Sequence, residues 1–172
     1  VEPLRMANHL SGKELYRWRT LTLDGQPVCA SDGLKITPDA STANAPALSA
    51  VIVCGGVDIQ RSVTRDHVQW LQGQARQGRQ MGAVCTGSWA LAKAGLLDGY
   101  DCSVHWEFLA AMQEAFPRAA ITTRLFSIDR NRNTSSGGTA PMDMMLHLIG
   151  REHGRELAAA ISEMFILSLI HI

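Results

Sequence analysis

Cys85 follows a short apolar run and directly precedes a glycine- and alanine-rich helical segment, in RQMGAVCTGSWALAKAGLLDG (79–99). A thiol at such a turn acts as a nucleophile when a base takes its proton, and otherwise forms part of the floor of a binding site. The positive end of the following helix favours a thiolate or a bound carboxylate at this position. The segment therefore indicates two kinds of chemistry, covalent catalysis by cysteine and anion binding.

Two further glycine-rich turns follow predicted strands, in VCGGVD (53–58) and TSSGGTAP (134–141). Ligands bind beyond the carboxyl ends of parallel strands, and glycine lets a backbone approach a ligand closely. Tight turning alone would explain any one of the three turns, but together they favour one shared site. The Walker and G-x-G-x-x-G patterns of nucleotide-binding loops are both missing from the sequence, so a nucleotide is not expected.

His105 is the histidine that we expect at this edge, because it closes the predicted strand DCSVHW (101–106). A histidine that only completes the hydrogen bonding of a strand end would look the same in the sequence. The other histidines considered fall on predicted helices and are expected at the surface or in packing. They are His9, His67, His147 and His153.

The elements that must position these residues alternate between strands and helices, which predicts an α/β fold with a mainly parallel sheet. The run ALSAVIVCGG (47–56) is continuously apolar, which is typical of a strand buried on both faces. The other strands of this part are expected within 80–85, 101–106 and 119–138. The helices are expected within 64–78, 87–97, 107–117, 139–154 and 155–165.

The first forty residues predict a helix in VEPLRMANHLSG (1–12) that ends at Gly12, and then a β-hairpin. Its first strand is expected in 14–23, and a turn at Asp24-Gly25 returns the chain through 27–41. A domain rarely begins so abruptly with a helix, so we expect an upstream strand that this sequence lacks. At the other end, residues 166–172 continue without a polar face and are expected to be a non-native tail.

The composition suits one globular domain with a full core, since 46% of the 172 residues are hydrophobic. Sixteen basic and sixteen acidic residues give no net charge, and no basic stripe argues for direct nucleic-acid binding by this segment. Four cysteines lack the spacing of a zinc site, so we expect reduced thiols in a cytoplasmic protein, with no metal and no cofactor. They are Cys29, Cys54, Cys85 and Cys102. No signal peptide or membrane-spanning segment is predicted.

Four motifs carry a more specific resemblance, namely VIVCGG, MGAVCTGSWALAKAGLLDG, SVHWEF and TSSGGTAPMDMMLHLI. Together and in this order they resemble the PfpI-type branch of the class I glutamine amidotransferase-like superfamily. Within that branch, residues 1–165 resemble the ligand-sensing domains of AraC-type transcriptional regulators. The opening VEPLRMAN resembles, more narrowly, the regulators of glycine betaine, carnitine and arginine catabolism.

The resemblance implies a flavodoxin-like three-layer α/β sandwich whose first strand precedes a helix like VEPLRMAN. It places the nucleophile-elbow position at Cys85 and oxyanion-type amides in the Gly55-Gly56 turn and at Thr86. It also implies a homodimer and a helix-turn-helix domain after a helix like AAAISEMF (158–165). That domain is absent here, so DNA would be bound only through a part that this chain lacks.

The resemblance also bears on catalysis. Peptidase-like members carry a histidine directly after the elbow cysteine, but here Thr86 stands there and cannot act as a base. The superfamily's other common histidine lies on the later strand region, and PRAAITTRLFSIDR (117–130) contains none. We therefore expect no catalytic residue and no enzyme activity. The alternatives are a cysteine-dependent hydrolase, hydratase or glyoxalase-like enzyme, and an interaction module with a vestigial pocket.

The predicted ligand site has a donor-rich floor and two walls. The floor consists of Gly55, Gly56, Cys85 and Thr86. His105 and Trp106 form one wall, and Ser136, Gly138 and Thr139 form the other. A small metabolite of the betaine, carnitine or amino-acid type would place its carboxylate on the floor.

An aromatic face would attract a quaternary ammonium by about 0.5–2 kcal/mol. Trp106 is the first candidate for this face. Trp89 is the second, and plain core packing is its alternative. The final two helices are expected to carry coupling to the missing domain, with Met142, Met144 and Met145 in the helix core.

Overall fold

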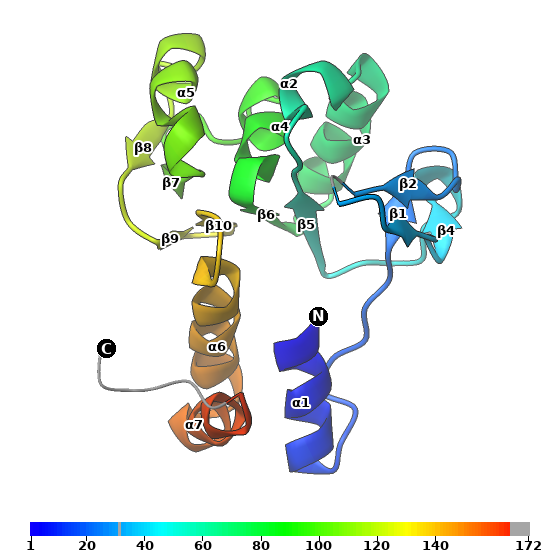
Figure 1. Cartoon of the computed structure of the whole chain (residues 1–172), viewed down its shortest axis with the longest axis vertical. Helices are drawn as coiled ribbons and strands as arrows, with labels where there is room; N and C mark the ends of the chain where they lie inside the picture. The colour runs from blue at the N-terminus through cyan, green and yellow to red at the C-terminus, as the bar shows by residue number, and fades with distance from the viewer. Residues whose placement is uncertain (31, 166–172) are drawn as a thin grey trace. The chain divides into compact units, whose positions relative to one another are not determined.

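The computed structural model describes residues 1–30 and 32–165, so the expected non-native tail at 166–172 lies outside the described residues. The described chain forms two compact units, one from residues 1–18 with 142–165 and the other from Arg19–Pro141 (Figure 1). Each unit has its own cluster of buried apolar side chains.

The main sheet of the unit 19–141 has four strands in the order β5-β6-β10-β9. They are β5 (Ala50–Cys54), β6 (Gln80–Val84), β10 (Arg132–Ser135) and β9 (Phe126–Asp129). The first three run parallel, and β9 runs antiparallel beside β10. Because the register pairs both Cys54 and Ser135 with Val84, the carboxyl ends of the three parallel strands meet at one edge, as predicted.

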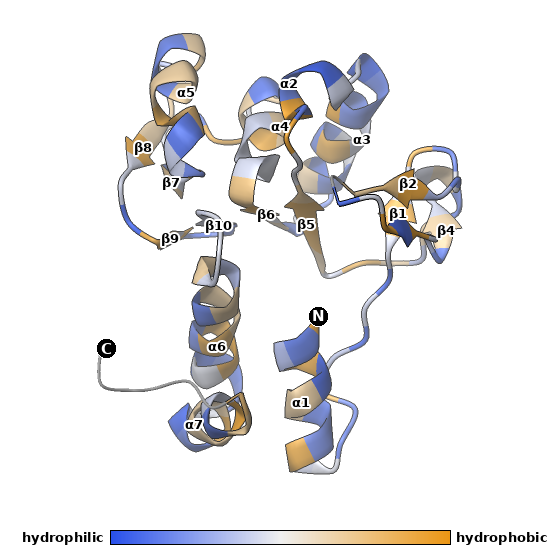
Figure 2. Cartoon of the chain, viewed as in Figure 1, coloured by the Kyte–Doolittle hydropathy of each residue, from blue (hydrophilic) through white to orange (hydrophobic). Residues whose placement is uncertain are grey.

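The helices of this unit are α2 (Ile59–Ser62), α3 (Arg65–Arg76), α4 (Ser88–Lys93) and α5 (Leu109–Ala115), with three 3-10 turns at η1 (Thr42–Asn44), η2 (Cys85–Gly87) and η3 (Trp106–Phe108). Among these helices, α3 and α4 pack against the main sheet, α2 packs against α4, and α5 packs against β8 (Ala120–Thr122). Met81 and Ala83 of β6 are fully buried in one cluster with Leu91 of α4. In Figure 2 the ribbon of β5 has hydrophobic colours, whereas the ribbon of α3 mixes hydrophilic and hydrophobic residues.

The prediction that β5 is buried on both faces is wrong. Val51 is 9% exposed and packs in the core, whereas Ile52 is 39% exposed. Side chains of a strand alternate between its two faces, and β5 is the edge strand of the described sheet, with β6 as its paired neighbour there. Only the face that carries Val51 and Val53 therefore packs on this cluster.

The predicted hairpin also differs from the structure. β1 (Leu21–Thr22) pairs parallel with β4 (Ala40–Ser41), and the antiparallel hairpin lies between them, formed by β2 (Val28–Cys29) and β3 (Lys35–Ile36). The Asp39 carboxylate explains the parallel pair, because it accepts hydrogen bonds from the backbone N–H of Thr20 at 2.6 Å and from its hydroxyl at 2.9 Å.

The remaining unit consists of α1 (Glu2–Ser11), α7 (Arg155–Met164) and the part of α6 (Ala140–His153) from Met142 onward. Its cluster contains Met6, Ala7, Ile149 and Ile161. Gly12 ends α1 with a left-handed φ of 64°, as predicted. Met144 is fully buried and its two neighbouring methionines are half-buried, which agrees with their expected place in the helix core.

The Tyr16 hydroxyl donates a 2.6 Å hydrogen bond to the Glu152 carboxylate within the same unit. Burial, together with this bond, raises the pKa of Tyr16, so the phenol stays protonated at neutral pH. No helix in the described part of the chain combines the length and the apolar character that a bilayer crossing needs.

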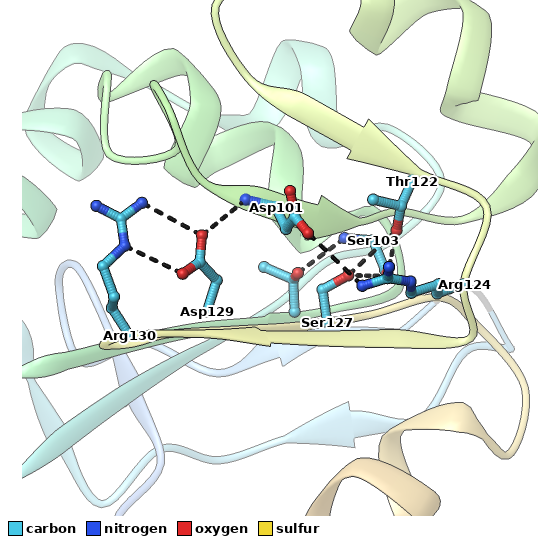
Figure 3. A network of polar contacts seen from close by, with 8 residues as sticks. Asp101, Ser103, Thr122, Arg124, Ser127, Asp129 and Arg130 are labelled. Atoms are coloured by element: carbon cyan, nitrogen blue, oxygen red, sulfur yellow. Dashed lines mark hydrogen bonds and ion pairs between the residues drawn. The ribbon is translucent and has the colours of Figure 1, made fainter.

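A polar network connects the two-stranded parallel sheet of β7 (Asp101–Ser103) and β8 (Ala120–Thr122) with the main sheet (Figure 3). The Asp129 carboxylate accepts from the Asp101 backbone N–H at 3.0 Å and from the Arg130 guanidinium at 3.0 Å. The Ser103 backbone N–H donates to the Thr134 hydroxyl at 2.8 Å. These bonds fix the strand that ends just before His105.

Two glycines hold the end of β5 against the turn that follows β6. A Cβ atom on Gly55 would overlap the Gly87 nitrogen and the Thr86 side-chain oxygen. A Cβ atom on Gly87 would overlap the Val53 carbonyl oxygen and lie 3.1 Å from the Gly55 nitrogen. The two backbones touch with no room for a side chain, so the position of Cys85 depends on this contact.

We expect Gly87→Ala to lower the free energy of unfolding by about 1–3 kcal/mol, because the added methyl group overpacks a backbone contact. Gly73→Ala is the control, since nothing lies within 4 Å of its Cβ position in α3. Alanine there should raise stability by about 0.5–1 kcal/mol. Urea unfolding followed by circular dichroism measures both; equal stability of the two variants would contradict the contact.

A second prediction concerns acid. The hydrogen bond from Arg130, with help from the Asp101 backbone N–H, lowers the pKa of Asp129 below its ordinary value of 3.8. The ionised carboxylate therefore stabilises the fold above that pH, and this contribution is lost as the pH falls through the lowered pKa. Asp129→Asn should be less stable than the parent at pH 7, and the difference should shrink as the pH approaches 3.

Urea unfolding at several pH values tests this expectation. Asp58→Asn is the matched control, because it removes the same charge from an exposed side chain. An Asp129→Asn variant whose stability follows the parent at every pH would contradict it.

Candidate functional site

Cys85 occupies a strand-to-helix elbow between β6 and α4, as the sequence predicted. Its φ of 58° is left-handed, which costs a residue other than glycine roughly 1–2 kcal/mol. Two backbone hydrogen bonds hold the strained turn: Cys85 N–H donates to Ser136 O at 3.3 Å, and Cys85 O accepts from His105 N–H at 3.4 Å. The half-buried thiol is thus fixed between the ends of β10 and β7.

The Gly55-Gly56 turn lies directly against the elbow. The Thr86 hydroxyl donates to the Gly56 carbonyl at 2.8 Å, and Thr86 is only 4% exposed, so its side chain holds the turn. Gly55 N–H donates to Val84 O at 3.4 Å. The Gly55 amide therefore already has an acceptor, and its expected role as an oxyanion-type donor stays a prediction. Its close packing explains why glycine stands there.

His105 lies on the opposite side of the elbow from this turn. A Cβ atom on Gly137 would overlap Cδ2 of His105 and lie 3.0 Å from its Nε2 and 3.5 Å from Sγ of Cys85. The imidazole and the thiol therefore border the same point beside the Gly137 backbone. The expected place of His105 at this edge therefore brings an imidazole ring close to the thiol.

Trp106 is the aromatic residue of this site that is open to solvent. It is 74% exposed, and its ring centroid lies 5.7 Å from that of His105. Trp89, the second candidate, instead makes edge-on contacts with Phe116 at 4.9 Å and Phe108 at 6.5 Å between ring centroids. Trp89 belongs to the core cluster, which confirms its alternative interpretation as a packing residue.

The second predicted wall is only partly tied to the elbow. Ser136 accepts from Cys85 N–H, and its own N–H donates to Leu125 O at 2.7 Å. Gly138, with a φ of 64°, and Thr139 are exposed in the turn before α6. Their place in a ligand site stays a prediction.

Sequence reasoning missed two residues of this site, Gly137 and Glu107. Glu107 N–H donates to Nδ1 of His105 at 3.4 Å, and one carboxylate oxygen of Glu107 lies 3.7 Å from the same nitrogen. The spacing of Glu107 two residues after His105, at the start of a helical turn, is the pattern that could have indicated it.

Cys102 and His67 lie in surroundings that give each of them a structural role. Burial raises the pKa of the Cys102 thiol to about 11, so it stays protonated and inert at neutral pH. His67 accepts from the Thr64 backbone N–H at 3.2 Å in the capping box of α3, and burial lowers its pKa. Among the described residues, no group of three or more histidine, cysteine, aspartate or glutamate side chains could hold a metal ion.

The sequence of the chain is similar to those of several known proteins. The chain is 82% identical over 170 residues to the HTH-type transcriptional regulator GbdR of Pseudomonas aeruginosa, covering 99% of this chain and 46% of GbdR. It is 32% identical over 134 residues to an isonitrile hydratase of Pseudomonas putida, covering 76% of this chain and 55% of the hydratase. The chain spans about half the length of the curated relatives it matches.

A crystal structure of an AraC family transcriptional regulator from Pseudomonas putida has a TM-score of 0.86 to this chain at 31% identity, covering 95% of this chain and 88% of that one. The expected flavodoxin-like α/β fold is confirmed by this neighbour and by the family match. The DJ-1/PfpI family model matches residues 1–151, and the chain belongs to this family.

Proposed function

We propose that this chain is the ligand-sensing domain of an AraC-type transcriptional regulator, which binds a small metabolite at the Cys85 elbow without transforming it. The observation that carries the proposal is a rigid thiol flanked by His105 and an exposed Trp106, in a chain 82% identical to GbdR. DNA would be bound by a helix-turn-helix domain outside this chain. The cytoplasm, where thiols stay reduced, suits this role.

The proposed ligand combines a carboxylate with a cationic or polar body, as in betaines, carnitine or amino acids. The amides of Gly56 and Thr86 and the ring of His105 would receive the carboxylate. The exposed face of Trp106 would receive a quaternary ammonium. Gly55 and Ser136 would hold the floor in place through the backbone contacts described above.

The signal would pass through different affinities of the ligand for two arrangements of a homodimer, since a ligand shifts an equilibrium only by its differential affinity. The final helices α6 and α7 are the proposed carriers of this coupling, because they are the last described elements of the chain.

Isothermal titration with glycine betaine tests the role of Trp106. Trp106→Ala should weaken binding by about 2- to 30-fold, which corresponds to about 0.5–2 kcal/mol for a cation on an aromatic face. Trp106→Phe keeps an aromatic face and should lose less. The isostere 3,3-dimethylbutyrate keeps the carboxylate but has an uncharged tert-butyl group, so it should bind the parent more weakly than betaine and should not distinguish Trp106→Phe from the parent.

Folded protein that gives no heat with betaine, carnitine or arginine would remove this ligand class. Equal affinity of the parent and Trp106→Ala for betaine would remove the aromatic contact alone.

One observation favours a second candidate function, a cysteine-dependent enzyme. Nε2 of His105 and Sγ of Cys85 border the same point, and a hydratase is among the relatives. The site would then need the ring to take the proton of the thiol.

Iodoacetamide alkylation at pH 7, with peptide mapping, separates the two functions. If the site only binds, Cys85 should react no faster than Cys29, which is exposed and serves as an internal control. Faster alkylation of Cys85, together with turnover of an isonitrile substrate that Cys85→Ser abolishes, would favour the enzyme.

A further inference from the structure

The two nitrogens of the His105 ring face different neighbours. Nδ1 accepts the backbone N–H of Glu107 at 3.4 Å. A Cβ atom on Gly137 would overlap Cδ2 on the opposite edge of the ring and would lie 3.0 Å from Nε2 and 3.5 Å from Sγ of Cys85, so this edge and the thiol border the same point. The ring is bonded at Nδ1, and its side chain is 22% exposed.

A neutral imidazole carries one proton, so one nitrogen donates a hydrogen bond and the other accepts. An N–H already points at Nδ1, so Nδ1 must be the acceptor and the proton must lie on Nε2. We infer that the backbone amide of Glu107 fixes His105 as an Nε2–H donor, so that the elbow presents a hydrogen-bond donor beside the thiol rather than a base.

The Glu107 carboxylate is the competing influence, because it would favour a proton on Nδ1. Its oxygen lies 3.7 Å from Nδ1, which is beyond hydrogen-bond range, whereas the backbone N–H is within it. The backbone amide therefore decides the tautomer of the neutral ring. When the ring is charged, the carboxylate faces Nδ1–H, and Nε2 still donates.

The consequence concerns what binds at this point. Glu107 and Cys85 are the titratable groups that lie near the ring among the described residues, and in both charge states Nε2 keeps its proton. An oxygen acceptor suits such a point, and a carboxylate suits it best because hydrogen bonds to a charged acceptor are stronger. The inference rests on the proposed sensing function and specifies that one ligand carboxylate oxygen lies against Nε2 and the thiol.

Nitrogen-15 NMR of the histidine-labelled chain tests the tautomer without any ligand. At a pH where the ring is neutral, long-range proton–nitrogen correlations should show the Nε2–H pattern for His105, and the signals that vanish in His105→Gln identify this ring. Glu107→Gln should keep the pattern, because it keeps the backbone N–H. An Nδ1–H pattern in the parent that changes in Glu107→Gln would show that the carboxylate decides, and would overturn the inference.

Titration with glycine betaine tests the donor role. A glutamine side chain can place an amide N–H near the position of Nε2, whereas asparagine places one near Nδ1. His105→Asn should therefore bind betaine about ten-fold or more weakly than His105→Gln, as expected for loss of a hydrogen bond to a charged group. Equal affinities of the two variants would contradict the donor role.

The two measurements fail separately. An Nε2–H pattern in a protein that binds neither betaine, carnitine nor arginine would support the inferred tautomer and contradict the proposed sensing function. An Nδ1–H pattern in a protein that binds betaine would contradict the inferred tautomer and support the proposed sensing function.

Discussion

The left-handed backbone of Cys85 is the constraint on which the arrangement of the site depends. A residue with a side chain resists this conformation, so it persists only where the surroundings determine it. Here Ser136 and His105 bond the two polar groups of the Cys85 backbone. The contact of Gly55 with Gly87 leaves the turn no room to relax. The thiol is therefore placed by backbone geometry, which varies little with side-chain motion.

The same constraint explains why β7 must be fixed independently. His105 follows β7, which pairs with β8 in a two-stranded sheet. Cys85 follows β6, which belongs to the four-stranded sheet. The buried contacts from Ser103 to Thr134, and the Asp129 carboxylate between Asp101 and Arg130, connect that sheet to β9 and β10. The network is polar because it supplies side-chain acceptors to the backbone N–H groups of Asp101 and Ser103. Through it, the ring of His105 keeps its place beside Gly137.

How much of this could be predicted from the sequence follows from the range of each interaction. The parallel strands, their common edge and the elbow at Cys85 could be predicted from apolar runs and glycine-rich strand ends, because these patterns are local in the sequence. The partner of Leu21–Thr22 could not be predicted, since the Asp39 carboxylate that selects it lies nineteen residues away from Thr20. The exposure of Ile52 likewise depends on which strand is at the sheet edge. The neighbours of the thiol could be predicted only in part. His105 was expected at the edge, but nothing in the sequence shows that the His105 ring and the Cys85 thiol meet beside Gly137.

Whether such a site binds or reacts is decided by one proton. A thiol beside an imidazole is the minimal arrangement for nucleophilic catalysis, and it is also compatible with a passive receptor. The difference lies in which nitrogen faces the sulfur with a free lone pair. With Nδ1 accepting from a backbone amide, the inferred tautomer keeps a hydrogen on Nε2, at the ring edge that borders the same point as the thiol. Under the proposed function, a fold shared with enzymes would hold a carboxylate and leave it unchanged, and it would keep both the cysteine and the histidine.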